Sequence, residues 1–238
     1  MNPSDLTPAQ RRRLRRRRAR RRRIIRNVLL AVLVLAVAVI GYFSWRWWPR
    51  PYYSAAQLGI HQIESEHDAD GDGIEDYMDM VEGARAYIET DPHYKSKYYA
   101  GGYPDDGYGV CTDVIWQAFQ AAGYDLKAMV DLDIEEQRGL YPFIEVVDSN
   151  IDFRRVNTLD TFFRRHAQKL TCSLDDPEDW QPGDIVIFGK RDHIGICSDR
   201  RSRDGIPFLI HHGTPVDDAV EQDVIREKKP TGHYRWQG

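Results

Sequence analysis

The sequence predicts an α+β fold preceded by one transmembrane helix, because the periodicity of apolar residues changes along the chain. Helical spacing comes first, over residues 81–90, 111–122 and 158–170. Short β-rich runs separated by turn residues follow, at residues 184–188, 193–198, 207–211 and 232–236. Helices followed by neighbouring strands predict N-terminal helices packed on an antiparallel sheet.

The N-terminal quarter of the chain is typical of a membrane anchor. The stretch from Val28 to Trp45 is uncharged and close to the ~20 residues needed to cross a bilayer. Twelve arginines from Arg11 to Arg26 place the preceding end in the cytoplasm. A cleavable signal peptide is the alternative, but no small-x-small cleavage site follows the stretch. We therefore expect an uncleaved, single-pass anchor in the cell membrane, with the C-terminal body outside.

Charge is divided unevenly along the chain. Residues 1–50 carry a net charge of +13, so the remainder of this chain of net charge -4 carries -17. Next to an apolar span, an arginine run serves as a topology signal, and we expect no nucleic-acid binding. The acidic body also argues mildly against tight electrostatic docking on anionic wall polymers.

Cys111 is the residue that most restricts the range of possible functions. It lies at the start of the predicted helix 111–122, where free N–H groups and the helix dipole favour thiolate and are expected to lower the thiol pKa below ~8.5. His193 begins one predicted strand and His211 ends the next. A cysteine at a helix start with histidines on later strands is the arrangement that a thiol hydrolase needs.

Several motifs resemble those of the NlpC-like and CHAP-like branch of the papain-like cysteine peptidases. They are Cys111-Thr-Asp, Trp180-Gln-Pro-Gly-Asp-Ile-Val-Ile-Phe188, His193-Ile-Gly-Ile, and a further histidine at the end of the next strand. The region from about Ile60 to Trp236 is most similar to an uncharacterised bacterial family grouped with that clan. That family shares Ala100-Gly-Gly-Tyr-Pro104 and Asn150-Ile-Asp-Phe-Arg-Arg155. Most members of the clan cleave amide bonds in cell-wall stem peptides, and some relatives are amidases or acyltransferases.

The resemblance implies a catalytic triad of Cys111 as nucleophile, His193 as general base and His211 as the residue that orients the imidazole. Two features depart from the clan. Asp113 follows closely after the cysteine and would oppose thiolate formation if it pointed inward. His211 and His212 are adjacent and point to opposite faces of a strand, so either could be the third residue, and we favour His211.

A second predicted site is the acidic segment 68–79. Aspartates occupy positions 1, 3, 5, 9 and 12 of a loop with glycine at position 6, a spacing that supplies the oxygens calcium needs. Because position 12 is aspartate and the hydrophobic residue is at position 7, the loop is more similar to thrombospondin type 3 repeats than to an EF-hand. The expected ligands of a structural calcium ion are Asp68, Asp70, Asp72, the Ile74 carbonyl, Asp76 and Asp79.

These interpretations divide the chain into five parts. They are a basic cytoplasmic tail (1–26), a transmembrane helix (27–48), a linker (49–60), a calcium-binding loop region (61–80) and a papain-like cysteine hydrolase domain (81–238). Two other functions remain as alternatives, an acyltransferase of the same fold and a catalytically inactive, calcium-dependent binding module.

The remaining cysteines and histidines carry weaker predictions. Cys172 and Cys197 could form a disulfide or could be small buried apolar residues, and the sequence leaves both open. The other histidines lack metal-ligand spacing and are interpreted as surface residues; they are His61, His67, His93, His166 and His233.

Overall fold

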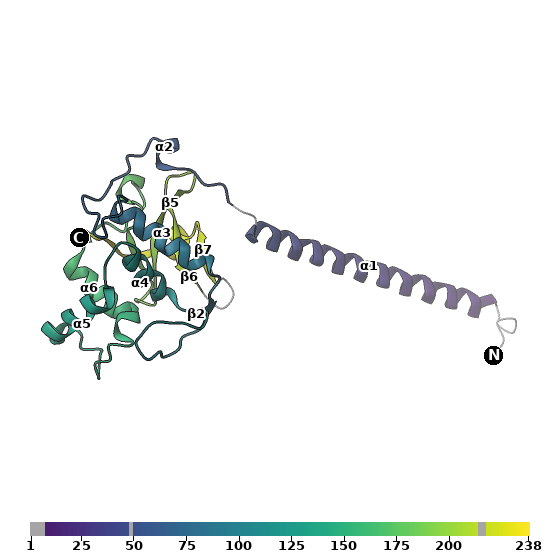
Figure 1. Ribbon diagram of the computed structural model, residues 1–238. Helices are drawn as coiled ribbons and strands as arrows, with labels where there is room; N and C mark the ends of the chain where they lie inside the picture. Colours follow the sequence, from purple (N-terminus) through teal and green to yellow (C-terminus); the bar gives the residue numbers. More distant parts are fainter. Residues whose placement is uncertain (1–7, 48–49, 214–217) are drawn as a thin grey trace. The chain divides into compact units, whose positions relative to one another are not determined.

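The computed structural model describes residues 8–47, 50–213 and 218–238, which belong to two compact units, Met1–Pro49 and Arg50–Gly238. The first unit is helix α1 (Pro8–Trp47), so the predicted basic tail and apolar span share one helix (Figure 1). Its segment Arg20–Ser44 is long and apolar enough to span a membrane, and an N-terminal signal sequence meets the same criteria. Residues 1–7 of the predicted tail and Trp48 of the predicted span lie outside the described residues.

The second unit is built on a six-stranded antiparallel sheet with the order β3-β8-β4-β5-β6-β7. The strands are β3 (Gln168–Lys169), β4 (Ile185–Phe188), β5 (His193–Arg201), β6 (Pro207–His212), β7 (Ala219–Gln222) and β8 (Pro230–Arg235). A separate parallel pair joins β1 (His93–Tyr94) to β2 (Tyr108–Gly109). All four predicted strands are therefore confirmed, and the sheet is antiparallel as expected.

The helices precede most of the sheet in the chain. They are α2 (Ala55–Leu58), α3 (Asp76–Glu89), α4 (Cys111–Ala121), α5 (Leu126–Glu136), α6 (Val156–His166) and α7 (Ile225–Lys228). The Glu75 carboxylate caps α3 by accepting the N–H groups of Tyr77 and Met78, and α4 is followed by Gly123 in the left-handed region at φ 81°. The three predicted helices are confirmed, and the mixed α+β class with them.

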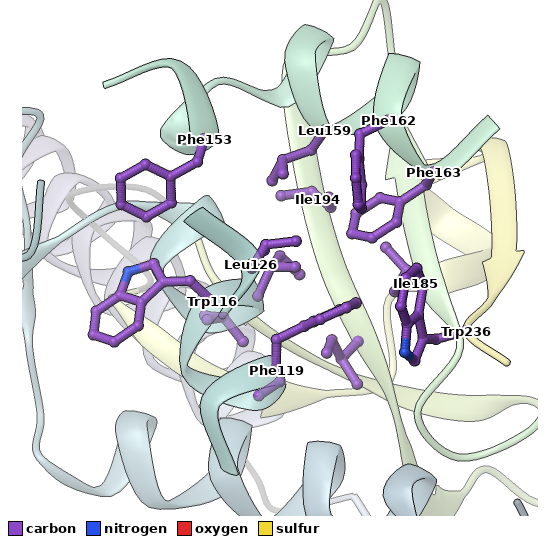
Figure 2. Packing of buried hydrophobic residues seen from close by; sticks show 14 of the residues in the cluster. Trp116, Phe119, Leu126, Phe153, Leu159, Phe162, Phe163, Ile185, Ile194 and Trp236 are labelled. Carbon is purple, nitrogen blue, oxygen red and sulfur yellow. The ribbon is translucent and has the colours of Figure 1, made fainter. Parts of the chain in front are cut away.

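Two hydrophobic clusters lie against opposite faces of the sheet. Alternate residues of each strand point to opposite faces, so Ile185, Ile194 and Ile210 join the helices in the main core. In that core the Phe119 ring of α4 lies 5.3 Å from the Trp236 ring and 5.6 Å from the Phe163 ring of α6 (Figure 2). Intervening strand positions and residues from the neighbouring loops and α7 form a second cluster on the other face; its members are Trp180, Val186, Phe188, Cys197, Ile206, Leu209, Val224 and Ile225.

Residues 50–60, predicted as a linker, pack on the C-terminal unit. Tyr53 exchanges two backbone hydrogen bonds with Arg201 of β5, at 2.9 and 2.8 Å. The Arg50 guanidinium lies 3.0 Å from the Asp223 carboxylate. The expected linker 49–60 is therefore attached to the C-terminal unit at Arg50 and Tyr53, by contacts that local composition does not reveal; Pro49 lies outside the described residues.

Candidate active site

Cys111 is the first residue of α4, and α4 packs against β5, the strand that His193 begins. Its side chain is buried, and the backbone N–H of Ile194 acts on the thiol in the direction that lowers its pKa. Burial raises the pKa of the Cys111 thiol to about 11, and the N–H groups of Ile194 and of the helix start reduce that rise only in part. The expected lowered pKa is therefore wrong for this state, since loss of solvation outweighs the helix start.

Asp113, the acid expected to oppose thiolate formation if its side chain pointed inward, is fully buried and forms an ion pair with Arg154. Its carboxylate accepts from Arg154 Nε at 2.7 Å and Nη2 at 2.8 Å. It also accepts from the backbone N–H of Val110 at 2.8 Å and from Trp116 Nε1 at 2.9 Å. Four donors hold this charge, so Asp113 fastens the start of α4, although it still adds to the rise in the Cys111 pKa.

The structure brings His193 and His211 into direct contact. His193 Nε2 lies 3.0 Å from His211 Nδ1, and His211 Nε2 lies 3.0 Å from the Gln222 side-chain nitrogen on β7. Burial, then the charge of Lys228, lowers the pKa of His193 to about 4, and burial lowers the pKa of His211 well below its ordinary value. Both imidazoles are therefore neutral near pH 7.

His212, the alternative third residue, makes different contacts. Its Nδ1 atom lies 3.2 Å from the Tyr87 hydroxyl, and its ring meets the Tyr94 ring edge-on at 5.5 Å. Among residues 50–213 and 218–238, no hydrogen bond joins the Cys111 thiol to His193 or His211. The structure thus brings His193 and His211 together on strands next to α4, the helix that begins at Cys111. It does not join the thiol to either imidazole.

The segments 100–104 and 150–155 meet beside the start of α4. The backbone N–H of Gly101 donates to Asn150 Oδ1 at 2.9 Å. At Gly102, a Cβ atom would lie 2.7 Å from the Phe153 ring, so only glycine fits this contact. Thr112 in turn donates its hydroxyl to the Arg154 carbonyl at 3.0 Å. Both segments therefore support the helix that carries Cys111.

Comparison with known proteins covers this same region. Residues 81–236 match the family model described as "Domain of unknown function (DUF1287)". The chain belongs to the DUF1287 family. A relative in Escherichia coli (strain K12), described as "Uncharacterized protein YijF", is 37% identical over 167 residues, which cover 66% of this chain and 80% of that protein. No solved structure matches the chain.

The DUF1287 domain contains Cys111, His193 and His211, whereas the acidic loop 68–79 precedes the matched residues. In that loop, one carboxylate oxygen from each of Asp68, Asp70 and Asp72 lies within 4.8 Å of the others. The two oxygens of Asp76 accept from the Ala69 N–H and the Tyr124 hydroxyl, and those of Asp68 accept from the N–H groups of Gly71 and Gly73. These hydrogen bonds fix the shape of the loop.

Two weaker predictions about the DUF1287 domain are also decided. All three cysteines are free thiols, so Cys172 and Cys197 form no disulfide. His233, interpreted as a surface residue, is fully buried. It lies 2.7 Å from the Thr171 carbonyl and 2.9 Å from the Asp184 carboxylate, and its ring stacks on Trp180 at 3.9 Å. A lone histidine in a short strand gives no local signal of such a polar partner.

Sequence reasoning missed Gln222 and Arg154 as parts of the site. Gln222 lies on an edge strand that no clear alternation predicts, and its side chain reaches His211 across the pair β6–β7. Arg154 was noticed only within the motif 150–155, and its partner Asp113 is 41 residues away in the chain. The one signal in the sequence was the acid Asp113 close to the cysteine, which needs a positively charged partner when it is buried.

Proposed function

We propose that this protein is a membrane-anchored, outward-facing cysteine hydrolase with a papain-like, NlpC-like catalytic domain, and that it cleaves amide bonds in cell-wall peptides. The observation that carries the proposal is the hydrogen bond between His193 and His211 beside the helix start that bears Cys111. An apolar helix suited to membrane insertion before the domain supports the location. The substrate class rests on the resemblance of the motifs.

General-base chemistry determines where protons lie along the histidine pair. For His193 Nδ1 to accept the thiol proton, His193 Nε2 must carry a hydrogen and donate it to His211 Nδ1. His211 then carries its own hydrogen on Nε2 and needs an acceptor there. A 180° rotation of the Gln222 amide supplies its oxygen at that position. Gln222 is thus a positioning residue that selects the tautomer of both rings.

The reaction begins from a neutral thiol and a neutral imidazole. The Cys111 thiol passes its proton to His193 Nδ1, and the thiolate sulfur bonds to the substrate carbonyl carbon. The N–H groups at the start of α4 can then donate to the oxyanion. Protonated His193 gives its proton to the departing amine, and water hydrolyses the thioester.

Digestion of purified cell-wall peptide fragments by the full chain in detergent, with products identified by mass spectrometry, tests the proposal. We expect amide cleavage that is abolished in Cys111→Ala and in His193→Ala and retained in His212→Asn. Absence of any cleavage by the unaltered chain would contradict a hydrolase and favour a binding module. Transfer of an acyl group to an added amine without release of free acid would instead identify an acyltransferase.

Gln222 provides a finer test of the same mechanism. Gln222→Glu keeps an acceptor beside His211 and should retain most of kcat, whereas Gln222→Leu removes the acceptor and should lower kcat with little change in KM. Equal activity of the two variants would show that the tautomers are not selected through this side chain.

A further inference from the structure

The acidic loop between α2 and α3 brings three negatively charged side chains close together. Oxygens of Asp68, Asp70 and Asp72 lie within 4.8 Å of one another on an exposed loop. Two glycines in left-handed conformations, Gly71 at φ 77° and Gly73 at φ 97°, turn the chain so that alternate side chains converge. Like charges at this separation repel, so the arrangement favours a cation among them.

Asp79 provides a second, independent observation. It lies in the first turn of α3, is only 5% exposed, and its Oδ2 atom is buried without a hydrogen-bond partner. Asp79 is also the last residue of the segment 68–79, so this buried oxygen lies where the acidic loop enters α3. A buried carboxylate oxygen without a donor costs free energy unless a positive charge compensates it.

We propose that the loop binds one calcium ion through Asp68, Asp70, Asp72 and Asp79, with the Ile74 carbonyl as a further oxygen ligand. All the side-chain donors are carboxylates, which exclude the nitrogen and sulfur sets that zinc and copper prefer. Calcium accepts many carboxylates in a flexible geometry, whereas magnesium retains most of its waters. Asp76 is not needed in this set, and its hydrogen bonds with the Ala69 N–H and the Tyr124 hydroxyl join the loop to the residue that follows the turn ending α4.

The loop is attached to the far end of the helix that carries Cys111. A Cβ atom at Gly123 would lie 3.0 Å from the Asp70 backbone nitrogen, so the loop backbone packs directly on the turn that ends α4. Tyr124, the next residue, donates its hydroxyl to Asp76. A bound ion would therefore order the loop, the start of α3 and the C-terminal turn of α4 together, and this role does not depend on the proposed catalysis.

Isothermal titration of calcium into the chelator-treated full chain in detergent tests the proposal. We expect one ion per chain, with an affinity weakened about tenfold or more in Asp79→Asn and unchanged in Asp105→Asn. Asp105 is an exposed aspartate outside the loop, so its variant has the same change in net charge. Absence of saturable binding to the unaltered chain, equal affinity in Asp79→Asn, or an equal response to magnesium would overturn the proposal.

Thermal unfolding of the same proteins separates loss of a ligand from loss of the fold. Without calcium, Asp79→Asn removes a buried carboxylate oxygen that lacks a hydrogen-bond partner and should melt at or above the temperature of the unaltered chain. With calcium, the unaltered chain should gain stability by mass action and melt above the variant. A melting temperature of the unaltered chain that does not change between calcium and chelator would contradict the site.

Discussion

The pairing of Arg154 with Asp113 makes a strong prediction, because it fixes a buried charge two residues after Cys111. The Asp113 carboxylate is fully buried, and the Arg154 side chain is 3% exposed. Arg154→Ala removes two of the four donors to this carboxylate and its only countercharge among the ion pairs of residues 50–213 and 218–238. Breaking a buried ion pair in this way costs about 3–5 kcal/mol.

For a unit of this size that loss corresponds to a fall in Tm of about 10 °C, measurable by circular dichroism of the full chain. Arg155→Ala is a matched control, because this neighbouring arginine is 40% exposed and contacts Asp152 at 3.3 Å. Its loss should change stability by less than about 1 kcal/mol. If Arg154→Ala and Arg155→Ala melt within a degree or two of each other, the pair does not hold the start of α4.

Three further predictions follow from the same contacts. Since burial holds the pKa of His193 at about 4, below its ordinary 6.5, unfolding takes up a proton at this ring. The free energy of unfolding should therefore fall as pH drops from 6.5 to 4. In His193→Asn the dependence of Tm on pH should weaken by the amount expected for one proton fewer taken up on unfolding. An unchanged dependence would count against the buried neutral ring. With a pKa of about 11, Cys111 should be alkylated slowly at pH 7 and ever faster beyond pH 9, as peptide mapping would show, and a plateau below pH 8 would indicate a low-pKa thiolate. At Gly83 a Cβ atom would lie 2.3 Å from Ala121 Cβ, so Gly83→Ala should lower the free energy of unfolding by about 1–3 kcal/mol in chemical denaturation. Gly139→Ala is the control, because a Cβ atom there meets open space. Equal losses of stability in the two variants would refute close packing of α3 on α4.

The fold class was predictable because it depends on local periodicity. The helix that begins at Cys111 and the strands around His193 are carried by patterns of apolar residues that belong to one segment each. α5 was not predicted, because charged and apolar residues alternate through Leu126–Glu136 without a clear stripe. β7 was missed because it is a short, half-buried edge strand.

The site was predictable in its residue types but not in its electrostatics. Adjacency of His211 to His193 follows from antiparallel pairing of neighbouring strands, which sequence order suggests. The raised pKa of Cys111 depends on burial by segments from the whole domain, and the direction of Asp113 depends on Arg154 from a distant turn. Such properties arise from tertiary contacts. The position of Cys111 at a helix start therefore predicted a lowered thiol pKa, whereas burial raises it.

The most direct test of the account is to acid-quench the full chain during digestion of wall peptides and map the peptides of the protein by mass spectrometry. If Cys111 is the nucleophile, it should carry an acyl adduct that hydroxylamine removes, as expected for a thioester. Cys172 and Cys197 should carry none. Turnover that proceeds at the normal rate in Cys111→Ala, or an adduct at another residue, would contradict the assignment of Cys111 as the nucleophile.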